Sequence, residues 1–264
     1  MPAENILYFG DTARMPYGNK SAATVTQFVR EIISYFEPHD PKHIVIACNT
    51  ATALTLSTIR AEFPHLAMSG VIEPGARAAV EAAGNRPRPI IGVIGTEGTV
   101  RSRAYERAIW RRRHYATINS KAAPLLAPIV EEGRSAEDPL VKLALQQYLT
   151  PLAQRGMDVL VLGCTHYPVY RPLIEVMLGP AVTVIDSADK CAEDVQRRLR
   201  STRLLREGTS AAGALRCFVT DDAARFSALA SRFLGLVIEP PTWVSPDELR
   251  AAAAPTEVGL RPAI

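Results

Sequence analysis

The stretch HIVIACNTATA, residues 43–53, decides the fold, and a second stretch of the same design, DVLVLGCTHYP, occupies residues 158–168. In each, a run rich in Val, Ile and Leu is followed by a small residue, then by a cysteine, and then by polar residues. Such short apolar runs predict buried parallel strands. Because open α/β sheets place ligand crevices at the carboxyl ends of their strands, Cys48 and Cys164 are expected to lie at such a crevice.

Strand-like and helix-like segments alternate along the whole chain, which is typical of parallel sheets with crossover helices. The expected strands are 6–9, 43–47, 90–95, 157–162, 182–185 and 215–219. The expected helices are 21–36, 50–63, 100–110, 138–155, 188–205 and 223–234. The predicted fold class is therefore α/β, with two similar lobes, each holding a mainly parallel sheet flanked by helices. The active site is expected in the cleft between the lobes.

The composition is that of an ordinary soluble globular protein, with 264 residues, 47% of them hydrophobic and 22% charged. The net charge of +3 is too small to indicate a nucleic-acid or membrane partner. The four cysteines show no C-x-x-C spacing, which argues against a disulfide framework or a metal site and favours a reducing cytoplasm. No signal peptide and no apolar run of about 18–20 residues is present, so a cytoplasmic location is expected.

Paired thiols indicate a specific chemistry. A single cysteine is most often a buried small apolar residue, and the matched surroundings of these two favour a chemical role instead. Two thiols that face one cleft from opposite sides can remove a proton from a carbon and return one to its other face, with neither a metal nor another cofactor. The Cys-Asn-Thr and Cys-Thr-His sequences also place hydrogen-bonding groups at a strand-to-helix turn, where a substrate carboxylate can bind.

The two cysteine segments resemble the paired signatures of glutamate racemases, in the aspartate/glutamate racemase superfamily: ACNTATA at 47–53 and LGCTHYP at 162–168. Three further segments resemble the same family, and these are YFGDTARMPYGNKS (8–21), VIGTEGTVRSRAY (93–105) and FVTDDAARFSALASRFLG (218–235). The resemblance covers about residues 1–240. It implies a first lobe of residues 1–72 plus 186–244 and a second lobe of 73–185. The Ala- and Pro-rich residues 245–264 are expected to be a weakly ordered tail.

The resemblance also implies roles for individual residues. Cys48 would abstract the α-proton from the D isomer and Cys164 from the L isomer. His166 and Glu131 would assist the second thiol, although an exposed carboxylate at a helix end is the alternative for Glu131. The positions that match substrate-contacting residues of the family are Tyr17, Gly18, Asn49, Thr50, Thr96, Thr99, Thr165 and His166.

The chain departs from the family pattern at its beginning. Family members normally open with a strand followed by D-S-G-V-G-G, in which the Asp assists the first thiol, whereas this sequence opens with MPAENILYFGDT. We therefore expect an N-terminally incomplete first lobe with unpaired strand edges and exposed apolar faces. Cys48 should lack its carboxylate partner, because Asp11 matches a different family position, and the chain as printed should be a poor racemase.

The expected function is a cofactor-independent racemisation that interconverts L- and D-glutamate and supplies D-glutamate for peptidoglycan synthesis. A homodimer is expected, with no metal and no membrane partner. The basic stretch at 101–113 is expected to be a solvated helix face and not a nucleic-acid contact, because Glu97 and Glu106 interrupt its charge. Two alternatives stay open: a related racemase for aspartate or another amino acid, and a truncated, non-catalytic binding protein.

Overall fold

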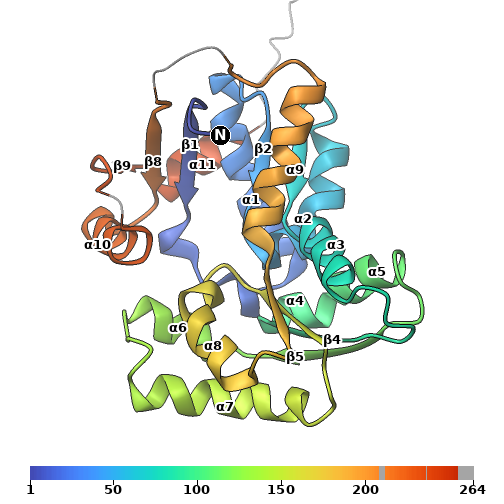
Figure 1. Cartoon of the computed structure of the whole chain (residues 1–264). Helices are drawn as coiled ribbons and strands as arrows, with labels where there is room; N and C mark the ends of the chain where they lie inside the picture. Colours follow the sequence, from blue (N-terminus) through green and yellow to red (C-terminus); the bar gives the residue numbers. More distant parts are fainter. Residues whose placement is uncertain (208–211, 236, 255–264) are drawn as a thin grey trace, which may run out of the picture.

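The computed structural model describes residues 1–207, 212–235 and 237–254, which form two α/β lobes, one above the other in Figure 1. The strands of this part of the chain are β1 (Ile6–Gly10), β2 (Ile44–Ile46), β3 (Met68–Gly70), β4 (Ile90–Gly95), β5 (Thr117–Ala122), β6 (Val159–Gly163), β7 (Thr183–Asp186), β8 (Leu215–Val219) and β9 (Thr242–Trp243). The α-helices are α1 (Ala22–Phe36), α2 (Asn49–Glu62), α3 (Ile72–Ala82), α4 (Glu97–Ser102), α5 (Ala104–Trp110), α6 (Leu126–Glu131), α7 (Pro139–Ala153), α8 (Arg171–Leu178), α9 (Ser187–Ser201), α10 (Ala223–Leu234) and α11 (Pro246–Ala252). This architecture confirms the predicted α/β class.

The lower lobe is built on one parallel sheet with the strand order β5-β4-β6-β7. All five residues of β6 are buried, because helices cover both faces of the sheet. On one face, Leu160 and Leu162 belong to a core with α6, α7 and α8. On the other face, Val159 and Val161 pack in a second core with α3 and α5. The two covered faces explain why the sequence of β6 is a continuous apolar run.

The upper lobe contains two separate parallel sheets, β1-β8-β9 and β2-β3. Helix α1 packs on both of them. Val29 and Ile33 lie in a core with Ile46 of β2, while Phe36 lies in a core with Phe218 of β8. Since β1 and β8 pair although they are more than 200 residues apart in sequence, the C-terminal part of the chain returns to complete this lobe.

Most predicted elements are present, and one predicted helix is divided. Residues 100–110 were expected to form a single helix, whereas α4 ends at Ser102 and α5 begins at Ala104. Between them Arg103 adopts a left-handed conformation, with φ of 54°, which breaks the helical hydrogen-bond ladder. The sequence also gave no indication of β3, which has only three residues, or of β5, whose residues alternate without a clear apolar face.

The end of the described chain differs from the prediction of a weakly ordered tail after residue 244. Residues Pro246–Ala252 form α11, with Ser245 as its N-cap accepting a hydrogen bond from the backbone of Glu248. Leu249 is fully buried in the core that contains Phe36 and Phe218, and this contact holds the helix against the upper lobe. The remainder of the predicted tail, 255–264, lies outside the described residues.

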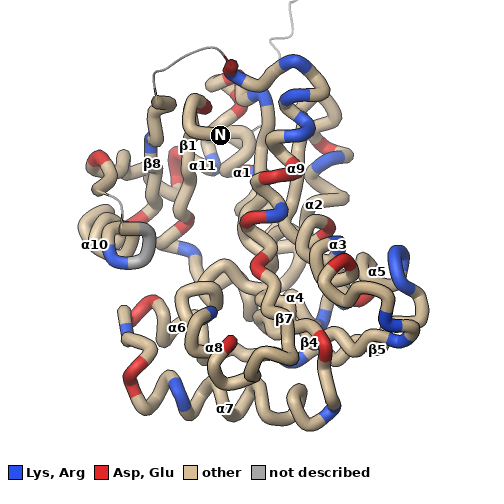
Figure 2. The backbone as a smooth tube through the Cα atoms, viewed as in Figure 1, with Lys and Arg blue, Asp and Glu red and all other residues tan. Residues whose placement is uncertain are grey.

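Acidic and basic residues alternate over both lobes (Figure 2). Part of the basic stretch at 101–113 is paired with carboxylates of the protein. Arg111 and Arg112 form ion pairs with Glu73, and Arg103 pairs with Glu106. In the described part of the chain, no helix has the length and apolar character needed to cross a membrane.

The buried contact of α11 predicts a measurable contribution to stability. Leu249→Ala should lower the free energy of unfolding by about 2–5 kcal/mol, because it leaves a cavity in a closed apolar core. Urea denaturation followed by circular dichroism measures this change. Leu143→Ala on α7 is the matched control, since Leu143 is 63% exposed and its truncation should cost little. Equal stability of the two variants would show that α11 is not docked as described.

Candidate active site

Cys48 lies at the turn between β2 and α2. It is the N-cap residue of α2, and its Sγ accepts a hydrogen bond from the backbone N–H of Ala51 at 3.5 Å. Burial raises the pKa of the Cys48 thiol, the Ala51 N–H acts in the opposite direction, and the charge of Cys164 raises the pKa further. The two thiols are therefore close enough to influence each other electrostatically, and Cys48 keeps its proton at neutral pH.

Cys164 directly follows β6 and begins a chain of hydrogen-bonded groups. Its Sγ lies 3.7 Å from Nδ1 of His166, and Nε2 of His166 lies 2.6 Å from Oε1 of Glu131 at the end of α6. The carboxylate of Glu131 thus points to the imidazole, which excludes the alternative of a free carboxylate at a helix end. A thiol, an imidazole and a carboxylate in sequence can hold or exchange a proton at Sγ.

The protonation states of His166 and Glu131 follow from their hydrogen bonds. Burial alone would lower the pKa of His166, but the hydrogen bonds to Cys164 and Glu131 outweigh it and raise the pKa to about 10. The hydrogen bond from His166 in turn lowers the pKa of Glu131. At neutral pH the imidazole is therefore protonated and lies between Cys164 and an ionised carboxylate.

A cluster of three hydroxyl groups lies where the two lobes meet. Oγ1 of Thr50, near the start of α2, is 2.8 Å from Oγ1 of Thr96 and 3.3 Å from Oγ1 of Thr99. Thr96 is the N-cap of α4 and lies 3.1 Å from Thr99. Because hydroxyls can both donate and accept, this cluster can bind the carboxylate or the amino group of a small substrate.

Asn49 provides a buried donor without a partner. The residue is 2% exposed, and its Oδ1 accepts a hydrogen bond from the hydroxyl of Tyr105 at 2.7 Å. Its Nδ2 is buried and has no partner among the described residues. A buried amide without an acceptor costs free energy, and a substrate oxygen that accepts from Nδ2 would remove that cost.

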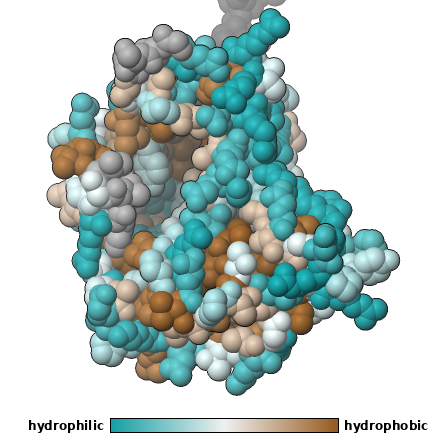
Figure 3. Space-filling model, viewed as in Figure 1, coloured by the Kyte–Doolittle hydropathy of each residue, from teal (hydrophilic) through white to brown (hydrophobic). Residues whose placement is uncertain are grey.

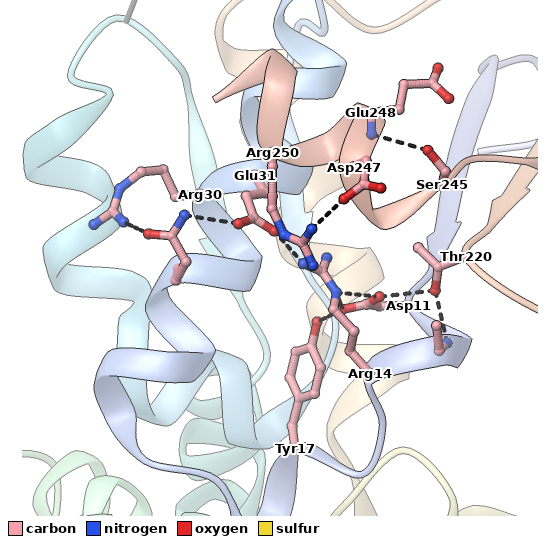
Figure 4. A network of polar contacts seen from close by, with 12 residues as sticks. Asp11, Arg14, Tyr17, Arg30, Glu31, Thr220, Ser245, Asp247, Glu248 and Arg250 are labelled. Carbon is pink, nitrogen blue, oxygen red and sulfur yellow. Dashed lines mark hydrogen bonds and ion pairs between the residues drawn. The ribbon is translucent and has the colours of Figure 1, made fainter. Parts of the chain in front are cut away.

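Tyr17 is held by a polar network behind the site (Figure 4). The carboxylate of Asp11 accepts hydrogen bonds from the Tyr17 hydroxyl, from Nε of Arg14 at 2.8 Å and from the Thr220 hydroxyl at 3.0 Å. Arg14 also pairs with the buried Glu31 of α1. Burial and the charge of Asp11 raise the pKa of Tyr17, so its hydroxyl remains protonated and oriented toward Asp11.

Gly18 brings the upper lobe into direct contact with the lower one. A Cβ at this position would lie 2.7 Å from Cβ of Thr96, so no larger residue fits without a shift of the backbone. Gly98 is also tightly enclosed, because a Cβ there would lie 3.0 Å from the carbonyl oxygen of Gly18. The loop that carries Tyr17 and Gly18 therefore forms one wall beside the hydroxyl cluster.

The structure brings the predicted residues together in two groups. Near the first thiol lie Asn49 and the hydroxyls of Thr50, Thr96 and Thr99, and beside the second lie Glu131, Thr165 and His166. Thr165 is the most peripheral, with an exposed hydroxyl 3.5 Å from Nδ1 of His166. Sequence reasoning missed the supporting residues Asp11, Arg14, Tyr105 and Thr220. All four lie within segments that resemble the family, so the resemblance could have indicated them.

Other parts of the described surface are less suited to this chemistry. A groove of about 700 Å³ lies between α2, β3 and α9, but it contains neither thiol and its basic rim is made of exposed arginines of α2 and α9. Within the described residues, no group of three His, Cys, Asp or Glu side chains is arranged to hold a metal ion.

Comparison with known proteins decides the family. Residues 1–195 match the family described as Asp/Glu/Hydantoin racemase. The chain belongs to this family. Among curated relatives of this racemase chain, the glutamate racemase of Geobacter metallireducens is 44% identical over 237 residues, which are 89% of this chain and 85% of the relative.

Solved structures of the same family are also similar. A glutamate racemase isoform from Bacillus anthracis matches with a TM-score of 0.86 and 37% identity, covering 93% of this racemase chain and 89% of that one. A glutamate racemase from Francisella tularensis in complex with D-glutamate matches with a TM-score of 0.83 and 29% identity, covering 92% and 89%. Both matches extend over the two lobes described above.

The hydrogen bond between Glu131 and His166 predicts the titration of the imidazole. In the native chain His166 should remain protonated well above neutral pH, and Glu131→Gln should lower its pKa toward the ordinary value of about 6.5. Ring-nitrogen NMR titration measures both values. Because the pKa of His166 is raised by folding, the stability supplied by the pair should be fully present below about pH 6.5 and lost as the pH rises toward 10.

The control for this titration is Glu37→Gln, which removes the carboxylate bonded to the exposed His65 and should leave His166 unchanged. A pKa of His166 that is the same in the native protein and in Glu131→Gln would contradict the described hydrogen bond.

Proposed function

We propose that this chain interconverts L- and D-glutamate by direct proton transfer at the α-carbon, with Cys48 and Cys164 as the two acid/base groups. The observation that carries the proposal is the pair of thiols at strand ends of opposite lobes, with Cys164 close enough for its charge to raise the pKa of Cys48. The naming of the relatives as glutamate racemases supports the choice of substrate.

In the proposed reaction, one thiolate removes the α-proton from one face of the substrate while the other thiol donates a proton to the opposite face. The Cα–H bond breaks, its electron pair passes into the conjugated α-carboxylate, and a new Cα–H bond forms with inverted configuration. Cys48 acts as the base toward D-glutamate and Cys164 toward L-glutamate. His166 and Glu131 assist the transfer of a proton to and from the Sγ of Cys164, since they are hydrogen-bonded to it in series.

The groups around the thiols are proposed to hold the substrate. The unpartnered Nδ2 of Asn49 donates to the α-carboxylate, and the hydroxyls of Thr50, Thr96 and Thr99 bind its carboxylate and amino groups. Tyr17 and Gly18 shape the wall against which the substrate side chain lies, and Thr165 closes the opposite end.

In the cell, the proposed role is the supply of D-glutamate for peptidoglycan synthesis in a bacterial cytoplasm, by a homodimeric enzyme that needs no cofactor.

Glutamate is preferred to aspartate as the proposed substrate, because the relatives that match at 44% and 42% identity are named for glutamate. A panel of D-glutamate, D-aspartate and D-alanine compares the substrates directly, and conversion of aspartate at a greater kcat/KM than glutamate would overturn the choice.

Substitution of the two thiols tests the chemistry. Cys48→Ser and Cys164→Ser should each lower the rate of racemisation roughly a hundredfold or more, since a hydroxyl is a much weaker acid than a thiol and each face needs its own group. Circular dichroism of the substrate solution follows the conversion in both directions. Cys217→Ala on β8 is the control, because this buried thiol has no polar partner in the site and should leave the rate within about twofold.

If either serine variant keeps the full rate in both directions, that thiol is not an acid/base group.

The unpartnered donor of Asn49 predicts an effect on binding. Asn49→Ala should raise KM for glutamate roughly ten- to a hundredfold, because a hydrogen bond to a charged group contributes about 1.5–3 kcal/mol. Tyr105→Phe, which removes only the hydroxyl that orients the amide, should produce a smaller increase. Steady-state kinetics separates the two parameters, and an unchanged KM in Asn49→Ala would exclude this residue from the substrate site.

A further inference from the structure

Helix α10 of the upper lobe reaches the part of the lower lobe that carries Glu131. In Figure 1, α10 lies at the left of the upper lobe, above α6, and in Figure 3 this part of the molecule forms the left side of a hollow bounded on the right by α9. Nη2 of Arg225, in the first turn of α10, donates a hydrogen bond to the backbone carbonyl oxygen of Glu131 at 3.1 Å. The carboxylate of the same Glu131 is bonded to His166. An arginine of one lobe therefore contacts a residue of the relay that Glu131, His166 and Cys164 form in the other lobe.

The start of α10 is anchored within the upper lobe. The side chain of Asp222 caps the helix by accepting a hydrogen bond from the backbone N–H of Arg225 at 2.9 Å. The hydroxyl of Thr12 donates to the carbonyl oxygen of Asp221 and accepts from its N–H. The ring of Phe226 packs against the aromatic ring of β1. Because the backbone of Arg225 is held in this way, the position of its side chain above α6 is set by the upper lobe.

The end of α6 depends on a partner from outside the helix. The last carbonyl groups of a helix have no donor within it, and a nearby cation stabilises them. The last turn of α6 contains no basic residue, and the carbonyl group of Glu131 accepts from Arg225 instead. The hydrogen bond from His166 lowers the pKa of the Glu131 carboxyl, burial opposes this effect, and the charge of Arg225 lowers the pKa further. Arg225 thus acts on both the backbone and the carboxylate of Glu131.

A second arginine of α10 lies on the same face of the helix. Arg232 follows Arg225 by seven residues, which is about two helical turns. Its Nη1 lies so near Gly133 that a Cβ added there would be 2.5 Å from it. Gly133 comes two residues after Glu131 and has a φ of 72°, in the left-handed region that favours glycine. Both arginines therefore contact one short segment of the lower lobe, which begins at Glu131.

We propose that Arg225 is a positioning residue that the upper lobe contributes to the relay of the lower lobe. Its hydrogen bond fixes the end of α6 and so keeps the carboxylate of Glu131 against Nε2 of His166, where the two atoms are 2.6 Å apart. Arg225 acts through Glu131 and transfers no proton itself. Its effect on the rate of racemisation rests on the proposed function, whereas its effect on the contact between Glu131 and His166 does not.

The titration of His166 tests the positioning role by the sign of the change. Removal of a positive charge near an imidazolium would by itself raise the pKa of His166. If Arg225 holds Glu131 in place, Arg225→Ala should instead lower this pKa by about 0.5–1, because the hydrogen bond from the imidazolium to the carboxylate is weakened. The other titratable groups beside this pair, Cys164 and Tyr8, are unchanged in the variant. Ring-nitrogen NMR measures the pKa without any need for turnover.

Two further variants show which property of the side chain matters. Arg225→Lys keeps a cation that can donate to the same carbonyl group, and should leave the pKa of His166 closer to its native value than Arg225→Ala does. Arg250→Ala on α11 is the matched control, because this exposed arginine pairs with Asp247 of its own helix. It should leave His166 unchanged. A pKa that is unchanged or raised in Arg225→Ala would overturn the positioning role.

The rate of racemisation is the second readout. Arg225→Ala should lower kcat roughly three- to tenfold, since an exposed charge-assisted hydrogen bond contributes modestly, while KM stays within about twofold. The loss should be the same for L- and D-glutamate, because enantiomers have equal free energies in solution. A higher KM with unchanged kcat would place Arg225 in substrate binding and overturn the proposal. Lack of racemisation by the native chain would overturn the proposed function, and it would be seen before any substitution is made.

Discussion

The hydrogen-bond ladder of β4, β6 and β7 is the constraint on which the rest of the site depends. It fixes the carboxyl end of β6, and Cys164 is the first residue beyond that end. Gly163, directly before the thiol, lies so close to β4 that a Cβ would be 2.8 Å from the carbonyl oxygen of Ile94. The thiol therefore has little freedom to move, and His166 and Glu131 can be bonded to it in series because the ladder presents it at a constant position.

The first thiol is supported less firmly. Strand β2 has three residues and pairs with β3 alone among the described strands, and the Sγ of Cys48 accepts a hydrogen bond from the backbone N–H of Ala51. The two halves of the site thus differ in physical character. One holds a preorganised proton relay, while the other relies on a helix N-terminus and on burial, which raises the pKa of its thiol.

The sequence predicted those parts of the fold that are encoded locally. The apolar run before Cys164 predicted β6, and the helix-like segment 21–36 predicted α1, which spans Ala22–Phe36. The thiols and the residues next to them were found for the same reason. What the sequence did not predict depends on distant contacts: Asp11 meets Thr220 across more than 200 residues, and Tyr105 meets Asn49 across the two lobes. Leu249 likewise gives order to a segment whose composition alone indicated little structure.

The most direct test of the two-thiol account follows the α-hydrogen itself. D-glutamate is incubated with the chain in ²H₂O, and mass spectrometry measures deuterium in each enantiomer during the first few per cent of conversion. If one thiol removes the proton and the other donates from solvent, the L-glutamate formed should carry deuterium while the remaining D-glutamate keeps its protium. Deuterium that enters the remaining substrate as fast as the product, or product that retains the original hydrogen, would contradict proton transfer between two separate groups.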